Sequence, residues 1–575
     1  MHNTTLASTS VMKFSQIVYQ RPKIDKFESK FSALLQEFES ALTFESQNQS
    51  LLNIYKLRDK FDTMYHFAYI KSHANTANAK FQEEIGFFDK ILPQVEKLVS
   101  RFYNALINAT FKEKLSKKWG KHLFTLALNK TKKFHPSIMA ELAIENQLKT
   151  KYTRLIGSVN FEYNDQKHNL KSIDSFIENP DRNIRKNASF AKWEALSKVQ
   201  DQLDGIFDEV VNVRHKMATK LGYKDFTELG YVKMDRTNYD REMIADFRNR
   251  LLKYLGPIAK KLEERQKKRL GYDNLYPFDR TIHFNSGNPK PKYQSEEILK
   301  RGKQMYADLS EETNKFFNTM IESEFMDVTN RPEKSLSSYC SDLSQFGMPF
   351  IFASFNGTSD DVKILTHEAG HAFQYFMGKN KEITEYRWPT FDAAEVHSMS
   401  MEYLTYPWMK NFFEEDAEKY FFSHISAVIS SMLSKCVGDH FQEVIYENPN
   451  MTADERATIW KEMEAKYMPN KDFMNNSYLE SGRLWQVYWH VYNFPFYFID
   501  YALAQICALQ IWQKNKIDPS NTWNDYMELC KAGGTLPFLE MIEKGNLKSP
   551  FEPGCIQSIA KDLEDYLDSI DDSKF

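Results

Sequence analysis

The stretch Thr358–Gly378, TSDDVKILTHEAGHAFQYFMG, decides how this chain is interpreted. Thr358 or Ser359 can cap the start of a helix, and the two aspartates that follow suit the positive end of its dipole. Gly378 can end the helix. These local signals predict one helix over the whole stretch.

The expected helix carries the pattern His-Glu-x-x-His. His367 and His371 are four residues apart, so both imidazoles project from one face and can bind one metal ion, with Glu368 beside them. The pattern occurs by chance in roughly a few per cent of chains of this length, and two buried helix histidines are then the alternative. A histidine six residues after the second would indicate the metzincin class, which Met377 excludes.

A tetrahedral zinc site needs a third protein ligand and an open position for water. Glu382 and Glu385 follow the motif helix directly, in an expected loop. In the next helical run, Glu395, Ser398 and Glu402 fall on one face. Glu395 can then bind the metal while Glu402 holds a ligand histidine from behind. A surface salt bridge explains Glu402 equally well.

Composition extends the helical prediction to the rest of the chain. Only 20 glycines and 19 prolines occur among 575 residues, and 42% of the residues are hydrophobic, enough for a large core. Alternation around residues 159–170 predicts a small hairpin, and residues 272–292 form a Gly- and Pro-rich loop before helical patterning resumes. Long stretches of apolar residues at helical spacing lie on both sides.

Charge and cysteine content exclude several classes of protein. Lys and Arg total 75 against 78 Asp and Glu, which gives a net charge of -3, without the basic imbalance or basic run that a nucleic-acid-binding protein usually shows. Five scattered cysteines predict reduced thiols rather than disulfides. Residues 1–23 lack a secretory signal pattern, and no run of 18 apolar residues predicts a membrane span. We therefore expect a cytoplasmic protein without nucleic-acid or membrane partners; the sequence leaves its oligomeric state open.

Three segments closely resemble the thimet oligopeptidase superfamily of zinc metallopeptidases. They are FIFASFNGTSDDVKILTHEAGHAFQ (350–374), YRWPT (386–390) and EVHSMSME (395–402). The branch is that of oligoendopeptidase F, with the Pz-peptidase-like members closest. The resemblance runs from about Ile177 to the C-terminus, and the helical N-terminal part fits the family more loosely.

The resemblance implies one zinc ion per chain, with ligands that map onto His367, His371 and Glu395. The chemistry of the residues agrees with this set. Zinc lowers the pKa of its bound water and polarises the scissile carbonyl. Glu368 then takes the water's proton and later delivers it to the leaving amine.

A tetrahedral oxyanion also needs hydrogen-bond donors, and residues 485–501 are rich in aromatic side chains with polar tips. In the family a histidine and tyrosines from this segment stabilise the transition state, a role that maps onto His490, Tyr497 and Tyr501. The two tyrosines are four apart and share a helical face. Ala504 stands where thimet-type members carry another tyrosine. Buried tyrosines of an aromatic core helix are the alternative.

Residues 349–356, just before the motif helix, alternate around Phe350 and Phe352 and predict a strand. In the family an edge strand at this place pairs with the extended substrate backbone. The resemblance therefore points to Ala353 and Ser354 as substrate-backbone contacts. Ordinary sheet packing explains the pattern nearly as well.

The predicted fold is mainly α: an elongated, two-lobed helical body that encloses a substrate channel, with a small β-sheet near the active site. Residues 1–176 form a helical N-terminal domain that roofs the channel, and residues 177–575 form the zinc-peptidase catalytic domain. The predicted function is a cytosolic zinc endopeptidase that cuts short, unstructured peptides.

Two other functions stay open. A zinc carboxypeptidase or peptidyl-dipeptidase on the same scaffold needs a basic residue that binds the terminal carboxylate of the substrate, and Arg387 or Arg483 can serve. A non-catalytic peptide-binding protein is the third possibility. The intact Glu368 argues against it, because a binder needs no base beside the metal.

Overall fold

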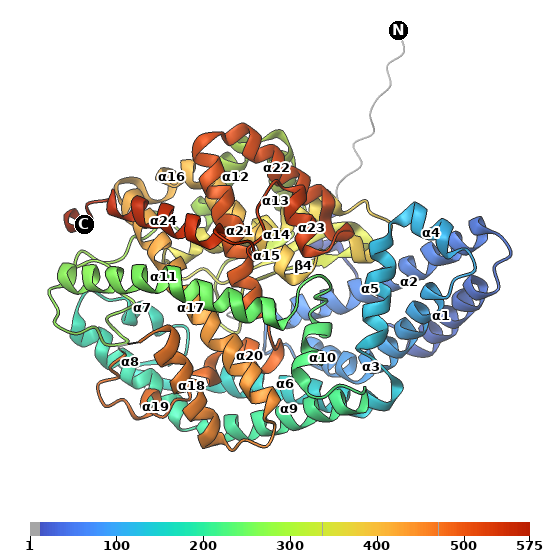
Figure 1. Cartoon of the computed structure of the whole chain (residues 1–575), viewed down its shortest axis with the longest axis horizontal. Coiled ribbons are helices and arrows are strands. Elements are labelled where there is room, and N and C mark those ends of the chain that lie inside the picture. The colour runs from blue at the N-terminus through green and yellow to red at the C-terminus, as the bar shows by residue number, and fades with distance from the viewer. Residues whose placement is uncertain (1–11, 336, 470) are drawn as a thin grey trace, which may run out of the picture.

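The computed structural model describes residues 12–335, 337–469 and 471–575. Figure 1 shows an elongated, mainly helical chain, which confirms the predicted fold class. No helix in the described ranges is both long and apolar enough to cross a lipid bilayer. The helices before the first strand are α1 (Ile24–Glu39), α2 (Phe44–Ala74), α3 (Ala79–Ile107), α4 (Lys112–Trp119), α5 (Lys121–Lys132) and α6 (Met139–Ser158).

The predicted hairpin is confirmed. Strands β1 (Asn160–Tyr163) and β2 (Gln166–Asn169) pair antiparallel. Asn164 and Asp165 connect them with φ angles of 54° and 61°. Asparagine and aspartate tolerate this left-handed conformation best among residues with a side chain, and it matches the right-handed twist of a two-residue hairpin.

Helices resume after the hairpin and stop where the loop is predicted. No helix or strand occupies residues 271–294, all of which are described, so the Gly- and Pro-rich loop is confirmed. The helices of this part are α7 (Asp174–Ile177), α8 (Arg182–Ser197), α9 (Gln200–Lys220), α10 (Phe226–Lys233), α11 (Arg241–Leu270), α12 (Ser295–Leu309) and α13 (Glu311–Glu322).

A three-stranded sheet lies directly before the motif helix. Its strands are β3 (Met326–Asp327), β4 (Tyr339–Leu343) and β5 (Met348–Phe352). Strand β5 is central, parallel to β3 and antiparallel to β4. All five of its residues are buried, because it lies between two strands and also packs against the motif helix. The predicted small sheet near the site is confirmed.

The chain after the sheet is helical again. The motif stretch forms α14, which begins at Asp360 and ends at Gly378, so the predicted helix is confirmed. Ser359 takes the N-cap position, but its side chain makes no capping hydrogen bond. The helices are α14 (Asp360–Gly378), α15 (Phe391–Leu404), α16 (Lys410–Phe413), α17 (Ala417–Glu447), α18 (Ala453–Tyr467), α19 (Ser477–Glu480), α20 (Trp489–Asn493), α21 (Phe498–Ile517), α22 (Pro519–Ala532), α23 (Phe538–Lys544) and α24 (Cys555–Asp568).

In the described ranges, two large hydrophobic cores and three smaller clusters hold these helices together. The smaller core lies among α1 to α5 and also takes in Ile383 and Tyr386, which follow α14. The larger core extends from α6 to α24, includes Leu148 and Tyr152 of α6, and also takes in Phe67 and Ile70 of α2. Helix α6 thus packs with the C-terminal part, chiefly against α9. The proposed domain boundary at residue 176 stays a prediction.

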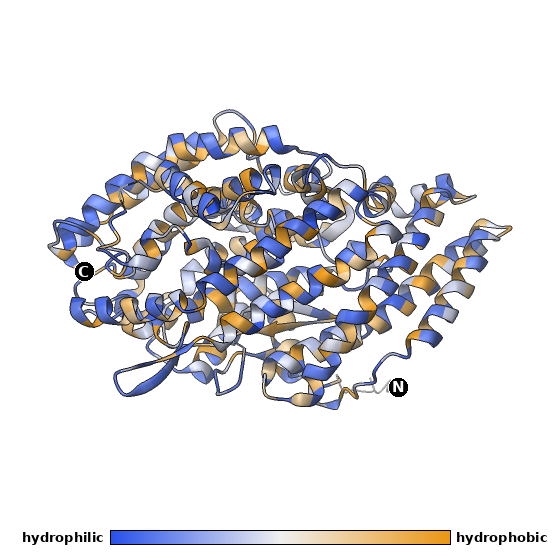
Figure 2. Cartoon of the chain, turned by 90° about the horizontal axis from the view of Figure 1, so that it is seen from below, coloured by the Kyte–Doolittle hydropathy of each residue, from blue (hydrophilic) through white to orange (hydrophobic). Residues whose placement is uncertain are grey.

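Figure 1 places α12, α13, α22 and α23 in the upper part of the molecule and α8, α9, α18 and α19 in the lower part. Figure 2 shows hydrophobic and hydrophilic residues interspersed along the outer helices, as expected where one face packs on a core and the other meets water. The enclosed substrate channel stays a prediction.

Helices α14 and α15 approach each other at Gly370. A Cβ atom at this position would lie 2.6 Å from Cα of Ser398 and 2.7 Å from the carbonyl oxygen of His397. Any side chain would therefore push the backbone of α15 away. The glycine lets the two helices pack in direct backbone contact, which places the first turns of α15 beside the motif histidines.

We expect Gly370→Ala to destabilise the fold by about 1–3 kcal/mol, because neither backbone can move without disturbing the core. Thermal unfolding followed by circular dichroism measures the effect as a lower melting temperature. Gly205→Ala is the matched control: Gly205 is exposed in α9 and its Cβ would meet nothing within 4 Å. Alanine there should stabilise the helix by about 0.5–1 kcal/mol. An unchanged melting temperature for Gly370→Ala would contradict the close contact.

Candidate active site

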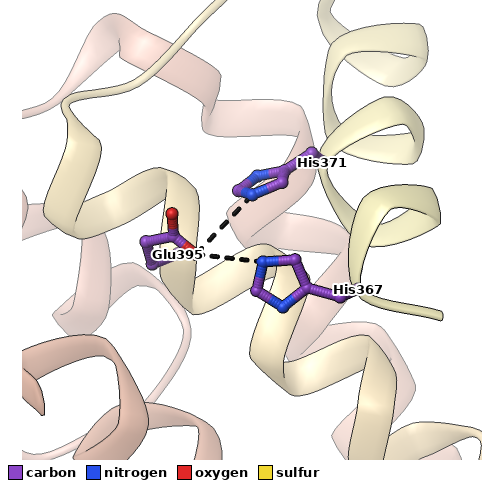
Figure 3. A group of neighbouring side chains, drawn as sticks. All are labelled: His367, His371 and Glu395. Atoms are coloured by element: carbon purple, nitrogen blue, oxygen red, sulfur yellow. Dashed lines mark ion pairs between the residues drawn. The ribbon is translucent and has the colours of Figure 1, made fainter. Parts of the chain in front are cut away.

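Three side chains from α14 and α15 meet at one point. The Nε2 atoms of His367 and His371 lie 3.3 and 3.6 Å from Oε2 of Glu395. Figure 3 marks these two contacts with dashed lines. The three ligand atoms all lie within 4.8 Å of one another. Across the described ranges, this is the one group of three or more His, Cys, Asp or Glu side chains with metal-site spacing.

This donor set fits a zinc ion. Ligand atoms about 2.1 Å from a tetrahedral centre lie about 3.4 Å from one another, close to the two nitrogen–oxygen distances. Two imidazoles and one carboxylate leave a fourth position for water, as in catalytic zinc sites. Burial lowers the pKa of His371 to about 4, so its imidazole is neutral and able to bind a metal at neutral pH.

Glu402 lies behind His367. Its Oε1 is 2.7 Å from Nδ1 of His367, and its Oε2 is 3.0 Å from Nε2 of His424 in α17. Tyr406 extends this series of hydrogen bonds, because its hydroxyl oxygen lies 2.5 Å from Nδ1 of His424. A carboxylate on the outer nitrogen orients a ligand histidine and raises its basicity. Sequence reasoning missed His424 and Tyr406, because no local spacing connects them to the motif.

Glu368 is buried beside the three candidate metal ligands. It is 6% exposed, and its Oε2 has no hydrogen-bond partner among the described residues. Burial raises the pKa of its carboxyl group to about 7. A carboxyl group with a free oxygen and a pKa near neutrality can accept a proton and give it back.

The structure also brings His490, Tyr497 and Tyr501 to the cluster. The Tyr497 hydroxyl donates to Oε1 of Glu395 over 2.5 Å, and the Tyr501 oxygen lies 3.2 Å from Nε2 of His490. Burial raises the pKa of both tyrosines well above the ordinary value. Burial, assisted by the charge of Lys435, lowers the pKa of His490 to about 3. At neutral pH the tyrosines are protonated and the histidine is uncharged.

A buried arginine fixes the short helix that carries His490. Arg214 in α9 donates to the carbonyl oxygens of Val491 over 3.2 Å and Tyr492 over 2.5 Å. Its Nε donates to Oε1 of Glu145 over 2.8 Å, which balances the buried charge. Sequence reasoning missed this residue. The signal in the sequence is an arginine among the apolar residues of a predicted helix face. A guanidinium buried there needs several hydrogen-bond acceptors, so it is expected to connect distant parts of the chain.

The backbone at Phe496 sets the direction of Tyr497. Phe496 has a φ of 68°, a left-handed conformation that costs energy for a bulky residue. Its N–H donates to Oε1 of Gln442 over 2.7 Å, and its carbonyl accepts from Arg236 over 2.6 Å. Its ring fills the space over Gly230, where a Cβ would lie 2.5 Å away. These contacts hold the strained turn, and none of them was predicted.

The edge-strand prediction is wrong for residues 349–356. Strand β5 lies between β3 and β4, and Ala353 follows its end. The N–H of Ala353 donates to the carbonyl of Asp327 over 2.9 Å, and its carbonyl accepts from Lys334. Both backbone groups of Ala353 already have a partner within the protein, although a carbonyl oxygen can accept a second hydrogen bond. The role of Ala353 as a substrate contact stays a prediction. The Ser354 hydroxyl donates to the Ser335 carbonyl over 2.8 Å, and its role as a substrate contact stays a prediction.

The other downstream glutamates lie away from the cluster. Oε1 of Glu385 accepts from Nη1 of Arg58 over 2.7 Å and also from the hydroxyl of Tyr103. Both partners belong to the N-terminal helices, so Glu385 joins the two parts of the chain. Glu382 is exposed in the loop. The structure therefore places neither residue with the motif histidines.

The two arginines considered for a terminal carboxylate are engaged in ion pairs. Arg387 is 2.9 Å from Oδ1 of Asp59. Arg483 lies 2.8 Å from Asp204 and 2.6 Å from Asp454. Their charges are already balanced within the protein, which removes the basis for assigning them to a substrate.

Comparison with known proteins agrees with this geometry. The profile described as "Peptidase family M3" matches residues 175–560, and that of the "Peptidase M3 N-terminal domain" matches residues 14–134. The chain belongs to peptidase family M3. It is therefore a metallopeptidase, and the predicted superfamily is confirmed.

Individual proteins similar to this chain carry the names oligoendopeptidase F and Pz peptidase, the two branches that the sequence resembles. An oligoendopeptidase F homolog of Borreliella burgdorferi is 21% identical over 520 residues, 86% of each chain. The solved structure of Pz peptidase A with inhibitor 2 is 44% identical, with a TM-score of 0.96, and the match covers 98% of this chain and 100% of that one. A candidate oligoendopeptidase F from Bacillus anthracis str. Ames is 40% identical, with a TM-score of 0.92 and coverage of 99% and 100%.

Glu402→Gln should weaken zinc binding by about 10–100-fold, because the amide orients His367 less strongly and raises its basicity less than a carboxylate does. Competition with a zinc chelator measures the affinity. Glu418→Gln is the control, since Glu418 is exposed and pairs with Lys574 at 2.9 Å rather than with a residue of the site. Equal zinc affinity in Glu402→Gln and wild type would contradict the role of Glu402.

Proposed function

We propose that this metallopeptidase is a zinc endopeptidase that hydrolyses internal bonds of short, unstructured peptides. The observation that carries the proposal is the cluster of His367, His371 and Glu395 beside the buried Glu368. We assign the first three as ligands of one zinc ion per chain. A carboxyl group with a free oxygen directly beside such a cluster is the arrangement that peptide hydrolysis requires.

The roles of the side chains follow from their contacts. A bound zinc ion supplies a Lewis acid, which lowers the pKa of water and polarises a peptide carbonyl. Glu368 accepts the proton of the attacking water through its free Oε2 and returns it to the leaving amine. Tyr501 and the adjacent His490 serve as donors to the oxygen that gains charge. Tyr497 orients Glu395, because its hydroxyl already donates to that carboxylate.

Exposed aromatic rings beside the cluster support a peptide substrate. Phe391 and Trp489 are each 39% exposed and Phe494 is 36% exposed, unusual values for such side chains. The Phe391 ring lies 5.0 Å from the ring of Tyr497, and Phe494 contacts both Phe391 and Trp489. This surface is continuous with the metal cluster, and we propose that it binds apolar side chains of the peptide.

We further propose that the N-terminal helices restrict access to the site, so that only short peptides enter. The packing of Ile383 and Tyr386, just past the motif helix, into the core of α1 to α5 supports this arrangement. A cytoplasmic location suits the five free cysteines, which a reducing compartment keeps as thiols.

Glu368→Gln should retain its zinc and lose at least about 10²-fold in kcat, because the amide cannot accept the proton. Metal analysis of the purified protein and the cleavage rate of a fluorogenic peptide measure the two properties. Glu382→Gln, the same change at an exposed position after the motif helix, should leave both unchanged. A zinc-loaded Glu368→Gln protein with full activity would refute the assignment.

A peptide blocked at both ends distinguishes endopeptidase from exopeptidase activity. We expect cleavage inside an N-acetylated, C-amidated peptide of about ten residues, with both fragments detected by mass spectrometry. The same peptide with free ends is the control. Cleavage of the free peptide alone, next to its C-terminus, would favour the zinc carboxypeptidase or peptidyl-dipeptidase alternative. If neither peptide is cut by zinc-loaded protein but both bind, the non-catalytic alternative holds.

A further inference from the structure

Two lysines lie beside the candidate active site and take no part in the mechanism above. Lys363 precedes His367 by four residues in α14, so the two share a helix face. Lys435 comes from α17, and its Nζ lies 5.2 Å from the centre of the Tyr501 ring and 5.4 Å from that of Phe498. Both lysines are half-buried, which leaves part of each side chain accessible.

Neither ammonium group forms an ion pair or hydrogen bond within the described ranges, whereas the buried Lys334 is 2.8 Å from Asp327. The two nearby carboxylates of the site are already engaged. Glu395 contacts both motif histidines and accepts from a tyrosine, and Glu402 lies between two histidines. Lys363 interacts with Glu402 and Asp360, and Lys435 with Glu395, only at longer range, so neither ammonium group is held in an ion pair.

The electrostatics agree with this geometry. Burial lowers the pKa of Lys435 to about 8, and the positive charge of Lys363 lowers it further. Burial opposes the charge of Lys363, but Glu402 and Asp360 raise its pKa, so this lysine is charged at neutral pH. An ammonium group in a partly desolvated place attracts an anion, because water screens its charge poorly. A carboxylate offers two oxygens and can accept from both at once.

We propose that Lys363 and Lys435 form a subsite of the active site that binds a carboxylate group of the peptide substrate. This inference rests on the proposed peptidase function and deepens it. The carboxylate has two possible sources: the C-terminal carboxylate of the peptide, or an Asp or Glu side chain near the scissile bond. The first directs cleavage to bonds near the C-terminus, and the second selects acidic sequences anywhere in a short peptide.

The test uses equilibrium binding, which does not depend on turnover. Four fluorescent peptides share one neutral sequence and differ in two ways, a free or amidated C-terminus and a Glu or Gln at one internal position. Their Kd values are measured with zinc-loaded Glu368→Gln protein by fluorescence anisotropy. We expect the carboxylate member of one pair to bind about tenfold more tightly, with a preference that falls as salt rises. The pair that shows the preference identifies the source.

Substitution of each lysine then tests the assignment. In the same background, Lys363→Met and Lys435→Met should each reduce the tenfold preference to near unity, since methionine keeps the apolar stem and removes the charge. Lys379→Met is the matched control: Lys379 follows α14, lies 3.6 Å from the Phe376 ring and has no ion pair in the described part of the chain. It should keep the full preference. Melting curves verify that each variant is folded.

Two outcomes would overturn the subsite: equal binding of all four peptides, or a carboxylate preference that survives both lysine substitutions. The proposed function fails separately, if wild-type protein with zinc cleaves none of the four peptides. If the peptides bind with a carboxylate preference that depends on the lysines but wild-type protein cleaves none of them, the subsite is supported and the peptidase assignment is refuted. If wild-type protein cleaves the peptides but binding shows no carboxylate preference, the peptidase assignment is supported and the subsite is refuted.

Discussion

The backbone contact between α14 and α15 at Gly370 is the constraint on which the site depends. Helix α14 contributes both motif histidines, and α15 contributes Glu395 and Glu402. With a Cβ only 2.6 Å from the opposite backbone, any other residue at 370 would separate the two helices. Nitrogen–oxygen distances of 3.3 and 3.6 Å cannot survive such a separation. The absence of a side chain at Gly370 thus sets the distance between the motif histidines and Glu395.

The contact between α14 and α15 also brings Glu368, Glu395 and Glu402 close together, and their different surroundings give them different pKa values. Glu395 is buried, yet His371 and His367 together with Tyr497 lower its pKa to about 2. Hydrogen bonds from His367 and His424 hold the pKa of Glu402 well below its usual range despite burial. Glu368 has no such partners, and burial raises its pKa to about 7. Partners keep two carboxylates charged, while desolvation leaves the third able to exchange a proton at neutral pH.

The sequence predicts what local spacing determines. The limits of α14, the β1–β2 hairpin and the shared face of Glu395 and Glu402 agree with local sequence signals and periodicity, although the side-chain cap expected at the start of α14 does not form. Contacts between segments that are distant in the sequence cannot be predicted from local spacing. Strand β3 has two residues, too few for any alternation, yet its pairing makes β5 central and occupies the backbone of Ala353. Arg214 and His424 were missed for a similar reason, since their partners lie far away along the chain.

Because of these contacts, two different parts of the fold hold the residues of the candidate active site. Helix α21 packs extensively against α15, so Tyr497 and Tyr501 keep a fixed place beside the three candidate metal ligands. His490, in contrast, belongs to a segment that Arg214 ties to α9. The strained turn at Phe496 joins the two segments. Because Arg236, Gln442 and Gly230 all hold that turn, the distance between the tyrosine and imidazole groups and the three candidate metal ligands depends on buried residues outside the site.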